Sequence, residues 1–399
     1  MSTVEAASRT RYRWVVLAVG IAAQASTAAF FQGLASVGPV IRAEGGFTLA
    51  QLGIVLGAPM AGFVATLLPW GLASDRFPER AVMAVGLSAT TVLLLVSSTG
   101  SGLWPLTVSL GLAGAAAASV NAASGRAVLR WFSPVRRGLA MGLRQTAIPL
   151  GAAAAALVLP LVVEHGGVAR CIQVLSLGTA AAALASWRWV REPPVAAPEA
   201  SGAEGPPPRG SESGGLALLV LAGCGLVVCQ ATFMSFSVEM LHGDGGLTLK
   251  AAALVFVIAQ LGGAAGRVAV GLWSDRTVDR VAPLVCVALA IGTSTCALGA
   301  VTGADPAVVV PMAVVAGSLA ICWNGLVFTA TAEMAPAHRV STALGAQSTA
   351  NYLMASVAPF ALGSLIGARG FGVGFGAAGA VGLAVGALLL LTRPTRNAQ

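Results

Sequence analysis

Long stretches without a charged residue constrain this chain more than any other feature of its sequence. Residues 81–112 and 370–392 contain no Asp, Glu, Lys or Arg. Because about 20 apolar residues in a helix cross the hydrocarbon core of a bilayer, each stretch is long enough to span a membrane. Twelve such segments predict an all-α membrane protein, with spans at 14–37, 48–72, 81–98, 104–128, 138–163, 168–190, 215–240, 249–272, 281–302, 306–331, 341–366 and 370–392.

The composition favours a helix bundle over a β-barrel. Of the 399 residues, 56% are hydrophobic and 10% are charged, whereas soluble domains carry about 25% charged residues. The 50 glycines suit helices that pack closely in lipid, where small residues let two backbones approach. Barrel strands would instead give alternating segments of about 10 residues.

The basic residues beside the spans are divided unequally between the two sides. Sixteen arginines fall at one set of span ends, and only Arg42, Arg170, Lys250 and Arg369 fall at the other. Since Lys and Arg concentrate in cytoplasmic loops, we expect a multi-pass protein of the cytoplasmic (inner) membrane with both termini in the cytoplasm. Membrane insertion then explains the net charge of +8, and we expect no nucleic-acid partner.

The chain divides near its middle. Residues 191–214 are rich in Pro, Gly, Ser and Glu, which predicts a flexible cytoplasmic linker. The linker separates a first six-helix half, 14–190, from a second half, 215–392, and residues 1–13 and 393–399 form short cytoplasmic ends.

The two halves share an internal repeat. A glycine, an aspartate and an arginine with one spacing occur twice, 200 residues apart: Gly71, Asp75 and Arg76, then Gly271, Asp275 and Arg276. Arg80 and Arg280 keep the same register, and Asn121 pairs with Asn324 at a separation of 203 residues. Two halves that both start in the cytoplasm are parallel repeats, a known transporter plan.

From residue 14 to residue 392 the sequence resembles the major facilitator superfamily, and the repeated loop motif is the most specific part of that resemblance. It departs from the family pattern at Pro78 and Glu79, where the family usually has Gly and a basic residue. The resemblance implies alternating access by two six-helix halves around a site near the midplane. It also implies a cytoplasmic latch formed by the repeated loop residues, Gly71, Asp75, Arg76, Arg80, Gly271, Asp275 and Arg276. The alternative is a loop turn whose charges only set topology.

Polar side chains inside the spans are the candidate substrate contacts. Such residues cost free energy unless they face a cavity or a partner. In the family the spans that carry them line the central cavity, so we expect hydrogen bonds to substrate from Gln24, Asn121, Gln230, Asn324, Asn351 and Tyr352. The alternative is hydrogen bonding between helices.

Three arginines inside the spans indicate an anionic substrate, because a guanidinium stays charged and binds a carboxylate through two parallel hydrogen bonds. Arg126 lies in a segment that resembles organic-anion symporters, and Arg144 lies on the fifth span. Arg267, four residues before Gly271, resembles the arginine of monocarboxylate transporters, although Gly263 stands where those proteins carry an Asp. Within the superfamily, the sequence resembles the organic-anion, monocarboxylate or cyanate permeases. The alternative is that all three arginines reach toward the cytoplasmic interface.

Carboxylates that could carry a coupled proton are scarce. Glu239, at the outer end of the seventh span, is the best placed. The alternative for Glu239 is a solvated position at the outer rim.

These features predict a secondary transporter of a small organic anion such as a monocarboxylate or sugar acid, with H+ as the candidate coupling ion. It would act as a monomer in the lipid bilayer. A first alternative is an exporter of hydrophobic or cationic compounds, for which Glu239 would be essential and the arginines dispensable. A second is a transporter-like solute receptor. No enzyme motif is present, and no cofactor or metal is expected.

Overall fold

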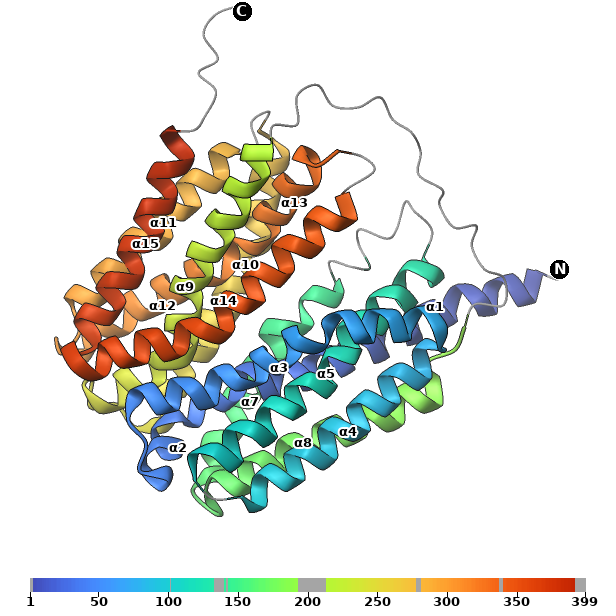
Figure 1. The fold of residues 1–399 in the computed structure, drawn as a ribbon, viewed down its shortest axis with the longest axis horizontal. Coiled ribbons are helices and arrows are strands. Elements are labelled where there is room, and N and C mark those ends of the chain that lie inside the picture. Colours follow the sequence, from blue (N-terminus) through green and yellow to red (C-terminus); the bar gives the residue numbers. More distant parts are fainter. Residues whose placement is uncertain are drawn as a thin grey trace, which may run out of the picture. The chain divides into compact units, whose positions relative to one another are not determined.

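The computed structural model describes residues 3–100, 102–132, 140, 143–192, 213–277, 281–336 and 340–391, and these residues form helices and short connections without a strand. Twelve helical segments are long and apolar enough to cross a membrane, which confirms the predicted all-α class and number of spans. Figure 1 shows the helices in chain order.

Contacts divide the chain into two compact units, residues 1–47 with 54–199 and residues 48–53 with 200–399. Helices of the first half are α1 (Thr3–Ala28), the π-helix η1 (Ala29–Gly33), the 3-10 helix η2 (Leu34–Val37), α2 (Gly38–Gly45), α3 (Leu49–Arg76), α4 (Glu79–Thr99), α5 (Leu103–Trp131), α7 (Ala147–Val163) and α8 (Gly167–Trp189). Helices of the second half are α9 (Ser213–Gly243), α10 (Leu249–Asp275), α11 (Val281–Ala300), α12 (Pro306–Cys322), α13 (Asn324–Met334), α14 (Val340–Arg369) and α15 (Phe371–Leu391).

Three predicted spans are interrupted rather than continuous. The first passes from α1 through η1 and η2 into α2, and so extends to Gly45 instead of ending at residue 37. The fifth has a turn at Thr146, before α7, and the tenth is broken at Trp323, between α12 and α13. Irregular backbone at membrane depth is tolerated where it is buried in protein or lines a cavity.

Within each unit, small residues let helices touch through their backbones. In the first unit, a Cβ added at Gly62 or Gly114 would collide with the backbone of the facing helix. In the second unit, a Cβ at Gly299 would lie 2.7 Å from the carbonyl oxygen of Gly372. Close approach of this kind is how helices associate in lipid, where the hydrophobic effect between them is absent.

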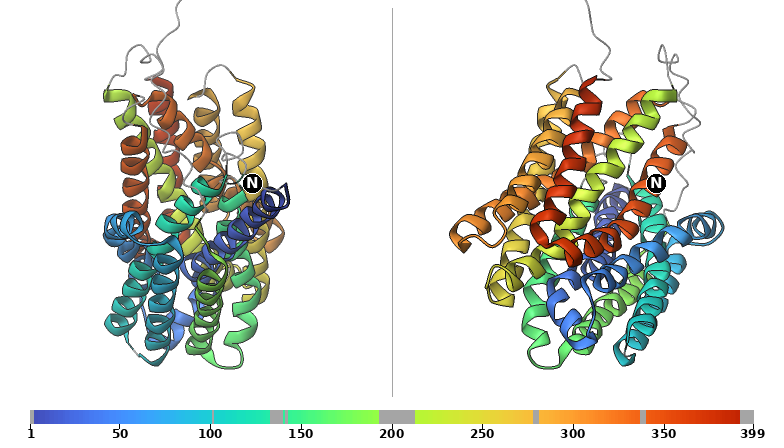
Figure 2. Two further views of the ribbon diagram at one scale, coloured as in Figure 1. Left: turned by 90° about the vertical axis from the view of Figure 1, so that its right-hand side faces the viewer. Right: turned by 60° about the vertical axis from the view of Figure 1, so that its left-hand side comes forward.

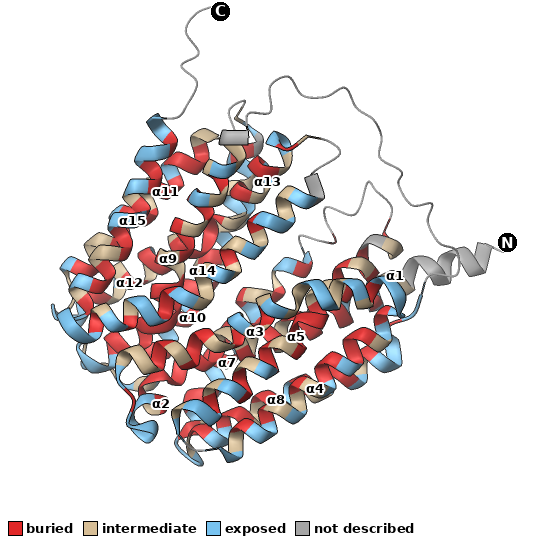
Figure 3. Ribbon diagram, viewed as in Figure 1, coloured by how far each residue is buried: buried red, intermediate tan, exposed pale blue. Residues whose placement is uncertain are grey.

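Large apolar side chains remain exposed on several helices, and Figure 3 shows the exposed positions along each helix in pale blue. Leu177 and Leu184 of α8 are each 69% exposed, and Leu68 of α3 is 72% exposed. In water such faces would be costly, but in a chain with twelve spans they contact acyl chains.

Candidate functional site

In the first unit, Arg144 is buried among polar side chains from two other helices. It precedes the turn at Thr146, and its side chain is 5% exposed. Its Nη1 atom donates to Oε1 of Gln24 on α1 at 2.6 Å and to Oγ of Ser124 on α5 at 3.0 Å. The guanidinium is therefore held in the protein interior, which argues against the alternative that Arg144 reaches toward the interface.

Gln24 is itself fixed by a second amide. Its Nε2 atom donates to Oε1 of Gln145 at 3.1 Å, so that Oε1 of Gln24 is turned toward Arg144. Gly125 lies beside the guanidinium, since a Cβ there would be 3.8 Å from Nη2 of Arg144, an ordinary van der Waals contact. Asn121 lies one turn before Ser124 on α5 and is half-buried. We call Gln24, Ser124, Arg144 and Gln145 the Arg144 cluster.

In the second unit, Arg267 of α10 lies against the break of the tenth span. It is half-buried, and its Nε atom donates to the carbonyl oxygen of Ile321, in the last turn of α12, at 2.9 Å. Carbonyl groups in the last turn of a helix lack helical partners, so this bond satisfies an acceptor and fixes the guanidinium plane. Cys322 and Tyr352 lie close enough to Arg267 for electrostatic interaction. Within the described ranges no carboxylate forms an ion pair with Arg267.

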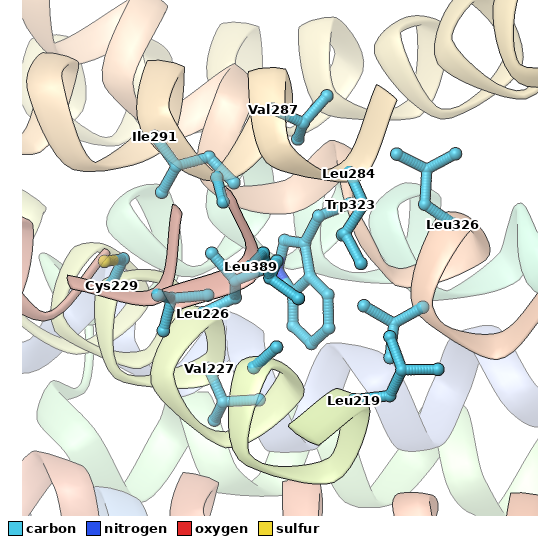
Figure 4. Packing of buried hydrophobic residues seen from close by; sticks show 14 of the residues in the cluster. Leu219, Leu226, Val227, Cys229, Leu284, Val287, Ile291, Trp323, Leu326 and Leu389 are labelled. Atoms are coloured by element: carbon cyan, nitrogen blue, oxygen red, sulfur yellow. The ribbon is translucent and has the colours of Figure 1, made fainter. Parts of the chain in front are cut away.

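The break itself is held by Gln230 of α9. Oε1 of Gln230 accepts hydrogen bonds from Nε1 of Trp323 at 3.2 Å and from Nδ2 of Asn324 at 3.4 Å. Trp323 is fully buried, and a buried indole N–H requires such a partner. Figure 4 shows the indole packed among apolar residues such as Leu284 and Leu389. The predicted residues Gln230 and Asn324 thus meet at one point of the fold, next to the residues that contact Arg267.

A separate polar group joins α13 and α14. Nε2 of Gln347 donates to Oδ1 of Asn351 at 2.9 Å, and Oγ1 of Thr331 donates to Oε1 of Gln347 at 3.4 Å. Gln347 is fully buried and Asn351 is 5% exposed. Gly223 of α9 packs against them, and a Cβ at this position would displace both amide groups.

Arg126, on α5, lies apart from these groups, and its side chain contacts the turn between α3 and α4. Its Nη1 atom is 2.7 Å from Oδ1 of Asp75, and its Nε atom is 3.6 Å from Oε1 of Glu79. Oε1 of Glu79 also accepts a hydrogen bond from Nη1 of Arg130 at 2.8 Å. Glu79 is buried, whereas Asp75 is largely exposed, with 71% of its side chain accessible. We call these four residues the loop cluster.

In the described part of the chain, the other predicted latch positions are exposed or border open space. A Cβ added at Gly71 or Gly271 would meet nothing within 4 Å. Arg76 and Arg276 are exposed, and the Arg80 guanidinium lies 5.2 Å from the ring centroid of Trp187 on α8. Asp275 is the last residue of α10, and its side chain lies outside the described part of the chain.

Glu239 lies four residues before the end of α9 and is 2% exposed. This burial argues against the alternative of a solvated residue at the outer rim. Sequence reasoning did not select six further residues of these groups: Glu79, Ser124, Arg130, Gln145, Trp323 and Thr331. Glu79 did stand out as a departure from the family pattern, and Trp323 is the residue before Asn324, but neither signal gives a partner.

Comparisons with known proteins agree with this architecture. The family model of the Major Facilitator Superfamily matches residues 20–359. An uncharacterized MFS-type transporter of Mycobacterium tuberculosis strain H37Rv is 36% identical over 356 residues, which cover 89% of this chain and 79% of that protein. A probable chloroplastic anion transporter of Arabidopsis thaliana is 25% identical over 125 residues, covering 31% of this chain and 24% of that protein. The solved structure of a peptide transporter in complex with sulfate has a TM-score of 0.77 at 14% identity, covering 94% of this chain and 93% of that one.

Proposed function

The chain belongs to the major facilitator superfamily, whose members are secondary transporters that work by alternating access, and we propose that its substrate is a small organic anion such as a monocarboxylate or sugar acid. The Arg267 guanidinium would provide the main counter-charge, with Arg144 as the second candidate. The similarity of part of the chain to a probable anion transporter supports the same substrate class.

The environment of Arg267 is the observation that carries this proposal. An uncompensated charge inside a membrane span costs several kcal/mol, roughly 2.5–3.5 on insertion scales, and marks a functional site by default. Arg267 uses Nε to bind the Ile321 carbonyl, and its Nη atoms form no hydrogen bond to another described residue. Two Nη groups in a fixed plane match the two oxygens of a carboxylate.

Arg144 is the second candidate for the counter-charge. Its Nη1 atom donates to Gln24 and Ser124, and these hydrogen bonds fix the guanidinium in place. Arg144 would raise the electrostatic potential for an anion in the first unit, and Asn121, one turn from Ser124 and half-buried, would contribute a hydrogen bond to substrate.

Arg126 is better assigned to the latch than to the substrate. It pairs with Asp75 and lies near Glu79, so its charge is already balanced on its own chain. We propose that the loop cluster holds the α3–α4 turn in the shape that the latch needs. Asp275 and Arg276 would serve the corresponding turn of the second unit.

The remaining polar residues divide between support and contact. Gln230 and Asn324 would fix the break beside Arg267, since the Gln230 carbonyl group already accepts two hydrogen bonds. Tyr352, close to Arg267, would contact the substrate directly, and Asn351 would be oriented by Gln347. Glu239, buried in α9, would carry the coupled proton. The protein would act as a monomer in the inner membrane with both termini in the cytoplasm.

The test is ligand-dependent thermal stabilisation of the purified protein in detergent. Monocarboxylates, sugar acids, inorganic anions and lipophilic cations are compared on the wild type and on Arg267→Ala, Arg267→Lys and Arg144→Ala. A ligand at about 100 times its Kd stabilises the folded state by roughly 2.7 kcal/mol. Arg188→Ala removes an exposed arginine of α8 and is the matched control.

We expect an organic anion to raise Tm in the wild type and in the control, and to lose this effect in Arg267→Ala. Stabilisation by lipophilic cations that survives every arginine substitution would refute the proposal and favour the exporter.

A further inference from the structure

A groove of about 430 Å³ opens between α4 and α8, near the end of the first unit where α8 begins. The two helices lie side by side in Figures 1 and 2 and are in extensive contact. The groove is lined by Leu95 of α4 and by Arg170, Gln173, Val174, Ser176 and Leu177 of α8. Its volume lies within the range of roughly 300–1,000 Å³ that is typical of ligand pockets.

The wall of the groove is apolar and faces outward from the unit. Leu95 is 45% exposed and Leu177 is 69% exposed, and Val92 of α4, one turn from Leu95, is 58% exposed. Leu177 lies seven residues beyond Arg170, which is about 10 Å further along the helix axis. Such a surface in a membrane-spanning pair of helices contacts acyl chains.

One basic side chain, Arg170, stands at the end of the groove. Arg170 is exposed, and its Nη1 atom donates to Oε1 of Gln173 at 3.3 Å. This bond turns the Gln173 carbonyl oxygen toward the arginine, and the Nε2 amide group donates to no other residue that the structure describes. No described carboxylate forms an ion pair with Arg170. Arg170 lies three residues after the start of α8, the depth at which lipid phosphates meet a spanning helix.

We propose that this groove binds one anionic phospholipid. Arg170 and the Gln173 amide hold the phosphodiester group, and an acyl chain lies along Leu95, Val174 and Leu177. The charge of Arg170 selects an anionic headgroup, and the apolar wall requires that the ligand carry a chain. The site shares no residue with the Arg144 cluster or with the surroundings of Arg267, and it does not depend on the transported substrate.

Native mass spectrometry of the full-length protein in detergent tests the proposal, with phosphatidylglycerol and phosphatidylcholine titrated separately. We expect one tightly held phosphatidylglycerol on the wild type. Arg170→Ala should weaken its binding by about fivefold or more, since one basic residue near a membrane surface contributes about that factor. Arg369→Ala, which removes an exposed arginine at the end of α14, is the matched control and should leave binding unchanged.

Leu95→Trp fills the groove and should weaken phosphatidylglycerol binding while Arg170 is still present. Glycerol phosphate, which has the charge but no chain, should not bind measurably. An equal loss in Arg170→Ala and Arg369→Ala would show diffuse attraction in place of a site and would overturn the proposal, as would unchanged binding in Leu95→Trp. Thermal unfolding in detergent without added lipid checks that each variant is folded.

Discussion

Glu79 is the residue of the loop cluster whose charge should matter most to stability. It is buried, with 4% of its side chain accessible, and it lies 2.8 Å from Arg130 and 3.6 Å from Arg126. Glu79→Gln keeps the shape of the side chain but removes the charge that balances the two guanidinium groups.

The magnitude follows from the exposure of the three partners. Breaking a fully buried ion pair costs about 3–5 kcal/mol, whereas an exposed pair contributes about 0–1 kcal/mol. The Arg126 and Arg130 side chains are 36% and 30% exposed, so water screens part of the interaction. We therefore expect Glu79→Gln to lower the free energy of unfolding by about 1–3 kcal/mol. Asp75→Asn, at an exposed carboxylate, should cost less than about 1 kcal/mol.

Thermal unfolding of the purified variants, followed by tryptophan fluorescence, measures this difference. The exchanged pair Glu79→Arg with Arg130→Glu should recover part of the stability that each single substitution loses, since the opposite charges face each other again. The reasoning is refuted if Asp75→Asn destabilises the protein as much as Glu79→Gln, or if the exchanged pair is no more stable than the single variants.

Three further predictions concern the second unit. Trp323→Phe removes the indole donor to Gln230 at the helix break and leaves a cavity, so it should lower Tm and raise KM for the substrate by about tenfold, measured by uptake into proteoliposomes. Gly223→Ala should lower Tm, because the added methyl group displaces the Gln347–Asn351 hydrogen bond, whereas an equal Tm would contradict the close packing seen here. Glu239→Gln should abolish the stimulation of uptake by an inward proton gradient while counterflow exchange persists. Retained proton stimulation would exclude Glu239 as the proton carrier.

The fold was largely predictable from the sequence because its signal is local. Each span is a run of apolar residues that can be recognised without knowing its neighbours, and the twelve predicted spans agree with the twelve found. The interruptions were not predictable in the same way. Trp323 is an ordinary apolar residue inside a hydrophobic run, and its partner at the break, Gln230, lies 93 residues away in the sequence.

The candidate site was predictable as a set of residues but not as a set of contacts. Burying a polar side chain in a span is costly, so Gln24 and Arg144 stand out from the sequence alone. Their hydrogen bond joins positions 120 residues apart and depends on how α1 packs against the fifth span. Glu79 and its partner Arg130 are also far apart in the sequence. Glu79 departs from the pattern of the loop motif, and the charge that balances it lies on another helix.

The most direct test of the central claim varies the charge of the ligand and the charge at position 267 together. The carboxylate that stabilises the wild type and its neutral amide analogue are each titrated against the wild type, Arg267→Ala and the control Arg188→Ala. If Arg267 is the counter-charge, the wild type and the control should prefer the carboxylate by about tenfold or more, and Arg267→Ala should lose that preference. An unchanged preference in Arg267→Ala would contradict the account.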